Sequence, residues 1–206
     1  VVDTSKVEGL KMDVGDETSI AAAATALKSR DGFQPLTHII HSAGIYMPGM
    51  SFDGTPRGGR KEQPVVTEND MMESFKVNAV GPLLVAQNFV PLMSRLSKDR
   101  SEKDLPILSI LTSKVGSVHD NSSGGSYAYR SSKSALNNIV KSLSVDLAGE
   151  VSVVLLHPGY VRTDMTKGNG LIDVDESVEG MLRAIEATDA TVGFRFVDFK
   201  ACLIPW

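Results

Sequence analysis

Short apolar runs alternate with helical patterns along this chain, and that alternation limits the fold more than any other feature. Four runs are typical of buried strands: 36–41, 107–112, 151–156 and 194–199, with a weaker fifth at 7–14. Helical patterns occupy 18–29, 68–97, 129–147 and 175–186. This order predicts right-handed βαβ crossovers, and therefore an α/β fold with a doubly wound, Rossmann-like parallel sheet covered on both faces.

Composition narrows the class of protein further. The 206 residues are 42% hydrophobic and 22% charged, which is typical of globular domains and excludes disordered, collagen-like and coiled-coil chains. We expect one domain over 1–206. The net charge is −4 without a long basic run, which argues against nucleic acid as a partner.

Cysteine usage and hydropathy bear on the compartment. The one cysteine, Cys202, can form neither an internal disulfide nor a thiolate metal site, and no metal site is predicted. No apolar run approaches the ~18 residues that cross a bilayer, and the first residues do not resemble a signal peptide. We therefore expect a soluble, cytoplasmic protein with no membrane partner.

A tyrosine and a lysine four residues apart are the strongest sign of chemistry. Tyr129 and Lys133 would share one face of a helix, where the ammonium can lower the pKa of the phenol. An isolated Y-x-x-x-K is more often a surface pair. Here, however, Ser113 follows the apolar run 107–112, which puts a hydroxyl at the carboxyl edge of the sheet, where open α/β folds bind ligands. Asn78 lies in a mostly apolar helical run before Gly81-Pro82. Its amide either only satisfies backbone groups or marks a helix bend that opens a carbonyl to water.

Several motifs in register make the chain resemble the short-chain dehydrogenase/reductase family. In order they are Asp13, Ser42-Ala43-Gly44, Asn78, Ser113, Tyr129-x-x-x-Lys133 and Pro158-Gly159-x-x-x-Thr163. The C-terminal stretch 193–206, which ends in Ile-Pro-Trp, resembles the carbonyl-reductase branch that contains the sniffer and C-factor proteins.

The resemblance implies a hydride transfer between NAD(P)H and a small carbonyl or alcohol. Tyr129 would be the general acid or base, Lys133 would lower its pKa and hold the nicotinamide ribose, Ser113 would orient the substrate oxygen, and Asn78 would hold a relay water. Thr163 would fix the nicotinamide carboxamide. The implied cofactor-binding residues are Asp13, Val14, Ser42, Ala43, Gly44, Tyr129, Lys133, Pro158, Gly159, Val161 and Thr163.

Two departures from the family pattern matter. The sequence contains no T-G-x-x-x-G-x-G turn, and 7–14 corresponds to the family's third strand, so the N-terminal βαβα part of the domain is expected to be missing. Strands from that part would lie between the third and fourth strands of the sheet. The chain therefore either is part of a longer reductase or is a catalytically inactive, truncated homologue that acts through protein contacts.

The second departure is His41-Ser42, where the family has two asparagines. We interpret His41 as a structural histidine with satisfied hydrogen bonds rather than a catalytic group. The resemblance favours NADP(H) over NAD(H), although the residues that decide between them belong to the missing part. It also implies a homodimer or homotetramer.

Overall fold

The computed structural model describes residues 7–56, 62–94, 105–189, 191 and 193–206. Its centre is a sheet of parallel strands in the order β1-β2-β3-β4. The strands are β1 (His38–His41), β2 (Ile107–Leu111), β3 (Ser152–His157) and β4 (Arg195–Asp198). Ile39 pairs with Leu108, Leu108 with Val153, and Leu155 with Phe196. The four predicted buried strands are confirmed, with ends shifted by one or two residues.

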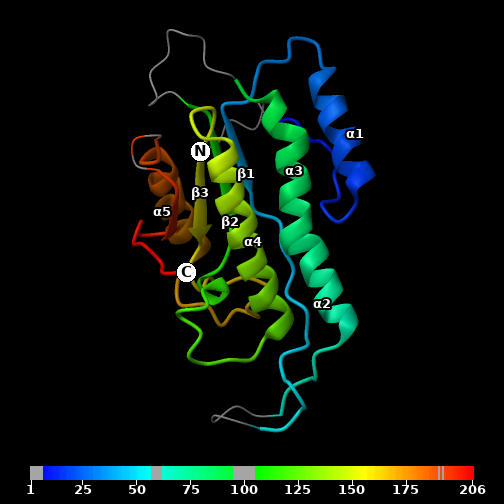
Figure 1. Cartoon of the computed structure of the whole chain (residues 1–206), viewed down its shortest axis with the longest axis vertical. Coiled ribbons are helices and arrows are strands. Elements are labelled where there is room, and N and C mark those ends of the chain that lie inside the picture. Colours follow the sequence, from blue (N-terminus) through cyan, green and yellow to red (C-terminus); the bar gives the residue numbers. More distant parts are fainter. Residues whose placement is uncertain (1–6, 57–61, 95–104, 190, 192) are drawn as a thin grey trace.

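The weaker strand predicted at 7–14 is wrong. This stretch is irregular and mostly exposed, and it lies apart from the sheet, ahead of α1 (Figure 1). No strand of the described chain runs beside it, so its backbone has no ladder partner. β1 is accordingly an edge strand that pairs only with β2 in the described residues, and Ile40 on it is 50% exposed.

Helices cover both faces of the sheet (Figure 1). They are α1 (Glu17–Lys28), α2 (Glu68–Phe75), α3 (Gly81–Phe89), α4 (Tyr127–Asp146) and α5 (Val174–Glu186). Leu136 and Val140 of α4 pack on Leu108 and Leu155, whereas Ile185 of α5 packs on the opposite face. The α/β class with a Rossmann-like parallel sheet is therefore confirmed.

The helical stretch predicted at 68–97 is not one regular helix. A π-helix (Lys76–Val80) separates α2 from α3, and a short 3₁₀ helix (Val90–Leu92) follows α3. Met93 and Ser94 are extended, with Met93 in a bridge to Leu36, while 95–97 lie outside the described residues. Asn78 lies in the middle of the π-helix, where the sequence suggested a helix bend, and its amide satisfies the backbone groups of Ile45.

The first turns of the helices follow local capping chemistry. Asp16 accepts hydrogen bonds from the backbone of Thr18 and Ser19 at the start of α1, and Thr67 forms a capping box with Asp70 at the start of α2. α4 begins two residues earlier than predicted, at Tyr127. Among the described helices, none is both long enough and apolar enough to cross a membrane.

Candidate active site

The predicted site residues lie at the carboxyl ends of the strands and on the helices beside them. Ser42, Ala43 and Gly44 follow β1, and Ser113 follows β2. Pro158 follows β3. Parallel strands end at one edge of a sheet, so three of the sequence motifs meet there.

Tyr129 and Lys133 occupy the first turns of α4. The Lys133 ammonium lies 5.8 Å from the centre of the Tyr129 ring and donates a hydrogen bond to the carbonyl of Leu111, at 3.2 Å. Tyr129 is half-buried, whereas Lys133 is only 4% exposed. Because Lys133 is buried, the two residues are not a solvent-exposed surface pair.

Lys133 is a buried cation with no carboxylate partner in the described chain. Its surroundings lower its pKa from 10.5 to about 8, because burial disfavours the charged form. A lysine held this way retains unused N–H donors and a charge that is poorly solvated. It is suited to a polar ligand that brings hydroxyl oxygens to the ammonium.

The expected lowering of the Tyr129 pKa is wrong for this structure. Burial raises the pKa of Tyr129 above 10.0, and a hydrogen bond with Ser113 offsets part of that increase. Tyr46 raises the pKa further, and Lys133 is not among the causes. The phenol therefore stays protonated at neutral pH, which suits a proton donor.

Ser113 stands beside this phenol at the end of β2. It is 8% exposed and begins a 3₁₀ turn (Lys114–Gly116), where its hydroxyl accepts a 3.4 Å hydrogen bond from the backbone of Val115. Two hydroxyl groups, from Ser113 and Tyr129, thus come together as possible donors to one oxygen atom.

Asn78 connects three segments that are distant in the sequence. Its amide oxygen accepts from the backbone N–H of Ile45 at 2.8 Å. Its amide nitrogen donates to the Ile45 carbonyl at 2.9 Å and to the Ser132 hydroxyl at 3.1 Å. The fully buried side chain therefore holds the segment after β1 against α4, and this accounts for a polar residue in an apolar helix.

Lys133, the residue predicted to hold the nicotinamide ribose, lies next to the open backbone of the segment that follows β1. Ser42 and Ala43 are exposed, and an added Cβ on Gly44 would lie 3.2 Å from the Asn78 amide oxygen and 3.5 Å from the Lys133 ammonium. Only a residue without a side chain leaves the lysine open at this point. The open backbone and the buried cation together match a ribose with two hydroxyl groups.

The other predicted cofactor residues flank this centre. Asp13 and Val14 precede α1, where the Asp13 carboxylate accepts a hydrogen bond from the Gly15 backbone at 2.8 Å, and Gly81 of α3 packs on the Val14 carbonyl. Within the described residues, Asp13 forms no hydrogen bond or ion pair with Tyr129 or Lys133, so the two groups of residues would meet only across a ligand.

The loop after β3 is fixed by its own hydrogen bonds. The Pro158 carbonyl accepts from the Ser177 hydroxyl of α5 at 2.6 Å, and the Val161 carbonyl accepts from Thr166 at 2.7 Å. Gly159 adopts a φ of +88°, and Thr163 is exposed. This loop presents the Thr163 side chain to solvent near the carboxyl edge.

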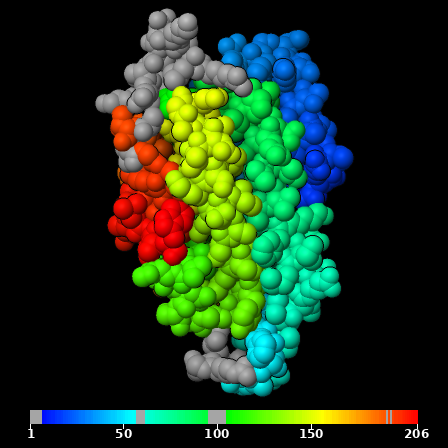
Figure 2. Space-filling view, in the orientation of Figure 1, coloured from blue at the N-terminus to red at the C-terminus, as the bar shows by residue number. Residues whose placement is uncertain are grey.

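The segment between β2 and α4 is held in place by α4 and by the C-terminal residue. Arg130 donates to the Val115 carbonyl at 3.2 Å and to the Ser123 hydroxyl at 2.7 Å, and Ser134 donates to the Gly116 carbonyl at 2.7 Å. The backbone N–H of His119 donates to the carbonyl of Trp206 at 2.9 Å. Figure 2 shows the C-terminal residues, in red, against this segment, in green.

Sequence reasoning missed Tyr46 and misjudged His41. The Tyr46 ring packs on Tyr129 with centroids 4.9 Å apart, and its only sequence signal is an aromatic residue two positions after Gly44. His41 is 5% exposed, as a structural residue would be, but neither of its ring nitrogens has a hydrogen-bond partner within the described chain. The prediction of a satisfied histidine is therefore wrong.

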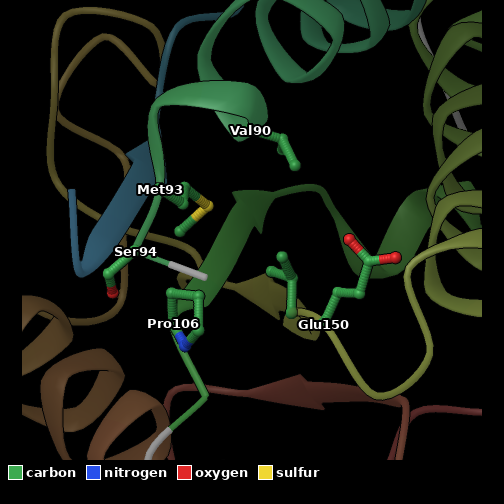
Figure 3. Close-up of a pocket in the computed structure, with 6 residues that line it drawn as sticks. Val90, Met93, Ser94, Pro106 and Glu150 are labelled. Carbon is green, nitrogen blue, oxygen red and sulfur yellow. The ribbon is translucent and has the colours of Figure 1, made fainter. Parts of the chain in front are cut away.

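A small hollow lies at the opposite edge of the sheet, before the strands begin (Figure 3). It has a volume of about 20 Å³, enough for roughly one water. Its lining comprises Val90, Met93, Ser94, Pro106, Glu150 and Val151. It is too small for a substrate. Across the described ranges, no three His, Cys, Asp or Glu side chains are grouped as metal ligands would be.

The fold and this constellation define a Rossmann-like α/β protein with a tyrosine, lysine and serine at the carboxyl edge of its sheet. The sequence matches the short chain dehydrogenase family over residues 2–171, so the chain belongs to that family. It is an oxidoreductase family.

Two relatives are similar to this chain over much of its length. The C-signal protein of Myxococcus xanthus is 41% identical over 66% of this chain and 79% of its own length. The 1-hydroxy-2-glutathionyl-2-methyl-3-butene dehydrogenase of Rhodococcus sp. (strain AD45) is 30% identical over 95% of this chain and 78% of its own.

Solved structures agree with this assignment. The NADPH-bound carbonyl reductase from chicken fatty liver superposes with a TM-score of 0.82 at 28% identity, over 98% of this chain and 79% of that one. The carbonyl reductase Sniffer of D. melanogaster gives 0.79 at 26% identity, over 96% and 77%. The predicted family and branch are therefore confirmed.

Proposed function

We propose that this protein reduces a small aldehyde or ketone with NADP(H), and oxidises the alcohol in reverse, using Tyr129 as the general acid or base. One observation carries the proposal: the Ser113 hydroxyl lies close enough to the Tyr129 phenol to lower its pKa, and Lys133 beside them is a buried cation with no acidic partner in the described chain. A cluster that served only stability would pair this charge with a carboxylate.

In the proposed reaction, bound NADPH supplies the hydride to the carbonyl carbon. The Tyr129 phenol donates its proton to the carbonyl oxygen as negative charge develops there, and Ser113 donates a hydrogen bond to the same oxygen. The raised pKa of Tyr129 keeps this proton in place at neutral pH. Lys133 would hold the ribose hydroxyl groups with the N–H donors that its single hydrogen bond to Leu111 leaves unused.

Proton return to Tyr129 is assigned to the Lys133 and Asn78 side of the site. The π-helix interrupts the regular hydrogen bonding of the helix around Asn78, and π-helical turns often occur at functional sites because they free backbone carbonyls. A water held at Asn78 would connect Lys133 with solvent. Because the Asn78 amide group is already committed to Ile45 and Ser132, we assign the water to the backbone.

The remaining cofactor contacts are assigned from where the other predicted binding residues lie in the fold. Asp13, with Val14 beside it, would face the adenine. The Ala43-Gly44 backbone, with Ser42 before it, would lie beside the adenosine ribose, and the loop of Pro158, Gly159, Val161 and Thr163 would face the nicotinamide. Thr163 is exposed and so is free to reach the carboxamide. NADP(H) is preferred over NAD(H) because two similar solved structures carry NADPH or NADP.

We further propose that the chain forms one Rossmann-like domain that lacks its N-terminal βαβα part. The open edge of β1, with Ile40 half-exposed, supports this arrangement because an apolar edge strand ordinarily has a neighbour. The same edge is the observation that favours the alternative, a catalytically inactive homologue whose β1 edge pairs with a partner protein.

Substitution of Tyr129 tests the catalytic proposal. Tyr129→Phe should reduce kcat/KM for NADPH-dependent reduction of 4-nitrobenzaldehyde by about 10²- to 10⁴-fold, because the proton donor is lost while the ring stays. NADPH binding should change little. Tyr127→Phe is the matched control, since Tyr127 lies on the same helix turn with its side chain exposed. Equal activity of Tyr129→Phe and Tyr127→Phe would refute the assignment.

Intact mass and cofactor titration on one purified sample separate the two functions. A mass above 22.1 kDa with micromolar NADPH binding supports the reductase. A mass of 22.1 kDa without binding of NADPH or NADH supports the inactive homologue. Light scattering on the same sample tests the proposed homodimer or homotetramer.

A further inference from the structure

Tyr46 lies directly against the proposed proton donor although it comes from a different part of the chain. Its ring centroid is 4.9 Å from that of Tyr129, with the ring planes inclined by 54°. This is the tilted geometry that aromatic pairs favour. The neighbouring residue, Ile45, is fixed at both its N–H and its carbonyl by Asn78, so the backbone that carries Tyr46 has a defined position.

The other end of the Tyr46 side chain is also held. Its phenol oxygen lies 2.8 Å from the Ser126 hydroxyl, immediately before α4, and the Ser126 N–H donates to the Met50 carbonyl at 2.9 Å. Two hydrogen bonds therefore join the segment 46–50 to the start of the helix that carries Tyr129.

Ser126 has an unusual conformation for a helix N-cap. Its φ is +48° and its ψ is 46°, in the left-handed region, and its side chain makes no capping hydrogen bond to the helix. A non-glycine residue in this region is strained, because its Cβ lies too close to the following carbonyl oxygen. The hydroxyl that would ordinarily cap the helix instead contacts Tyr46. The local geometry thus favours the Tyr46 contact at the expense of the cap.

We propose that Tyr46 is a positioning residue, which holds the Tyr129 ring in one orientation and shields one side of it from water through its contacts with Tyr129 and Ser126. This inference rests on the proposed function, because it assigns a role toward the proposed proton donor. Tyr46, which lies two positions after Gly44, would thereby act in the site although it is not one of the family's sequence motifs.

Burial is the main reason that the pKa of Tyr129 is raised, and Tyr46 contributes to the increase through its own charge interaction. Removal of the Tyr46 ring admits water to Tyr129, and removal of its hydroxyl alone breaks the contact with Ser126 while the ring packing remains. Removal of the ring therefore tests whether Tyr46 shields Tyr129 from water, and removal of the hydroxyl tests whether the contact with Ser126 holds Tyr46 in place.

The test is a titration of Tyr129 that does not require activity. The chain has four tyrosines, and incorporation of 3-fluorotyrosine lowers the pH range in which they titrate. Their four ¹⁹F resonances are assigned by single Tyr→Phe substitutions. In Tyr46→Ala the pKa of Tyr129 should fall toward that of a solvated residue, and in Tyr46→Phe it should fall less. Tyr127→Ala, which removes an exposed tyrosine, should leave the titration of Tyr129 unchanged.

The second measurement is the steady-state rate of 4-nitrobenzaldehyde reduction by NADPH. Tyr46→Ala should lower kcat by about 10-fold or more without a matching change in the Kd for NADPH, because a misplaced proton donor slows the chemical step. Ser126→Ala should resemble Tyr46→Phe, and the double variant should be no worse than either single one. Tyr46→Leu replaces Tyr46→Ala if the alanine variant fails to fold.

An unchanged Tyr129 titration in both Tyr46→Ala and Tyr46→Leu overturns the inference, even if the variants are less stable. A lowered pKa of Tyr129 supports it. If no form of the protein, including the wild type, reduces a carbonyl, the proposed function fails while the titration still decides whether Tyr46 positions Tyr129.

Discussion

Acidification is expected to destabilise this protein through His41. The imidazole is 5% exposed, and its pKa is lowered from 6.5 to about 4 by burial, with a further contribution from the positive charge of Lys133. Between these two values the unfolded chain binds a proton that the folded chain does not. Stability is therefore fully present above pH 6.5 and is lost as the pH falls toward 4, by about 2 kcal/mol at pH 5.

The comparison of wild type with His41→Leu isolates this contribution. Leucine has a similar volume and needs no hydrogen bond, so the variant should be at least as stable at pH 7.5, where the two orphaned ring nitrogens penalise the wild type. Between pH 7.5 and pH 5 its advantage should grow by about 2 kcal/mol. Urea unfolding at the two pH values measures the difference.

His157 and His119 make the comparison specific. Burial also lowers the pKa of His157 to about 4, but His157 is present in both proteins and cancels in the difference. His119→Asn is the control because its side chain is exposed. If the stability difference between wild type and His41→Leu stays constant with pH, then His41 is not held neutral in the folded chain, and the reasoning is refuted.

Two further predictions test the contacts around the site. Lys133→Met should weaken NADPH binding and lower kcat together, by about 10-fold or more each, because it would remove the proposed contact with the ribose that positions the cofactor. Fluorescence titration measures the binding and steady-state kinetics the turnover, and a loss confined to one of the two would contradict this role. Gly81→Ala should destabilise the fold by about 1–3 kcal/mol in urea unfolding, since the new Cβ would lie 2.6 Å from the Val14 carbonyl, whereas Gly9→Ala, with nothing within 4 Å, should have a much smaller effect.

Local sequence patterns predicted the elements that bury continuous apolar surface. The runs at 107–112 and 151–156 became β2 and β3, whose residues are almost all buried, because such runs are stable only inside a covered parallel sheet. The stretch 7–14 has a weaker pattern and stays irregular, since a strand also requires a neighbour for its backbone groups. Pairing is a property of the whole chain and cannot be predicted from one segment.

The candidate site, too, could be predicted only in part from the sequence. The spacing of Tyr129 and Lys133 placed them on one helix face, and their proximity followed. The direction of the Tyr129 pKa shift was mispredicted because the shift depends on how deeply the folded chain buries the phenol. One of the groups beside the phenol is Tyr46, which lies 83 positions away in the sequence. The orphaned nitrogens of His41 are likewise a property of the assembled interior.

The hydrogen bonds of Asn78 have a kinetic consequence. They join residues 33 and 54 positions away from it, so they can form only after two long loops have closed. Contacts of this range slow folding and are completed late, after local helices have appeared. The buried amide is therefore expected to become protected from hydrogen exchange among the last groups in refolding, and a partly folded chain would contain α4 without an assembled tyrosine, lysine and serine centre.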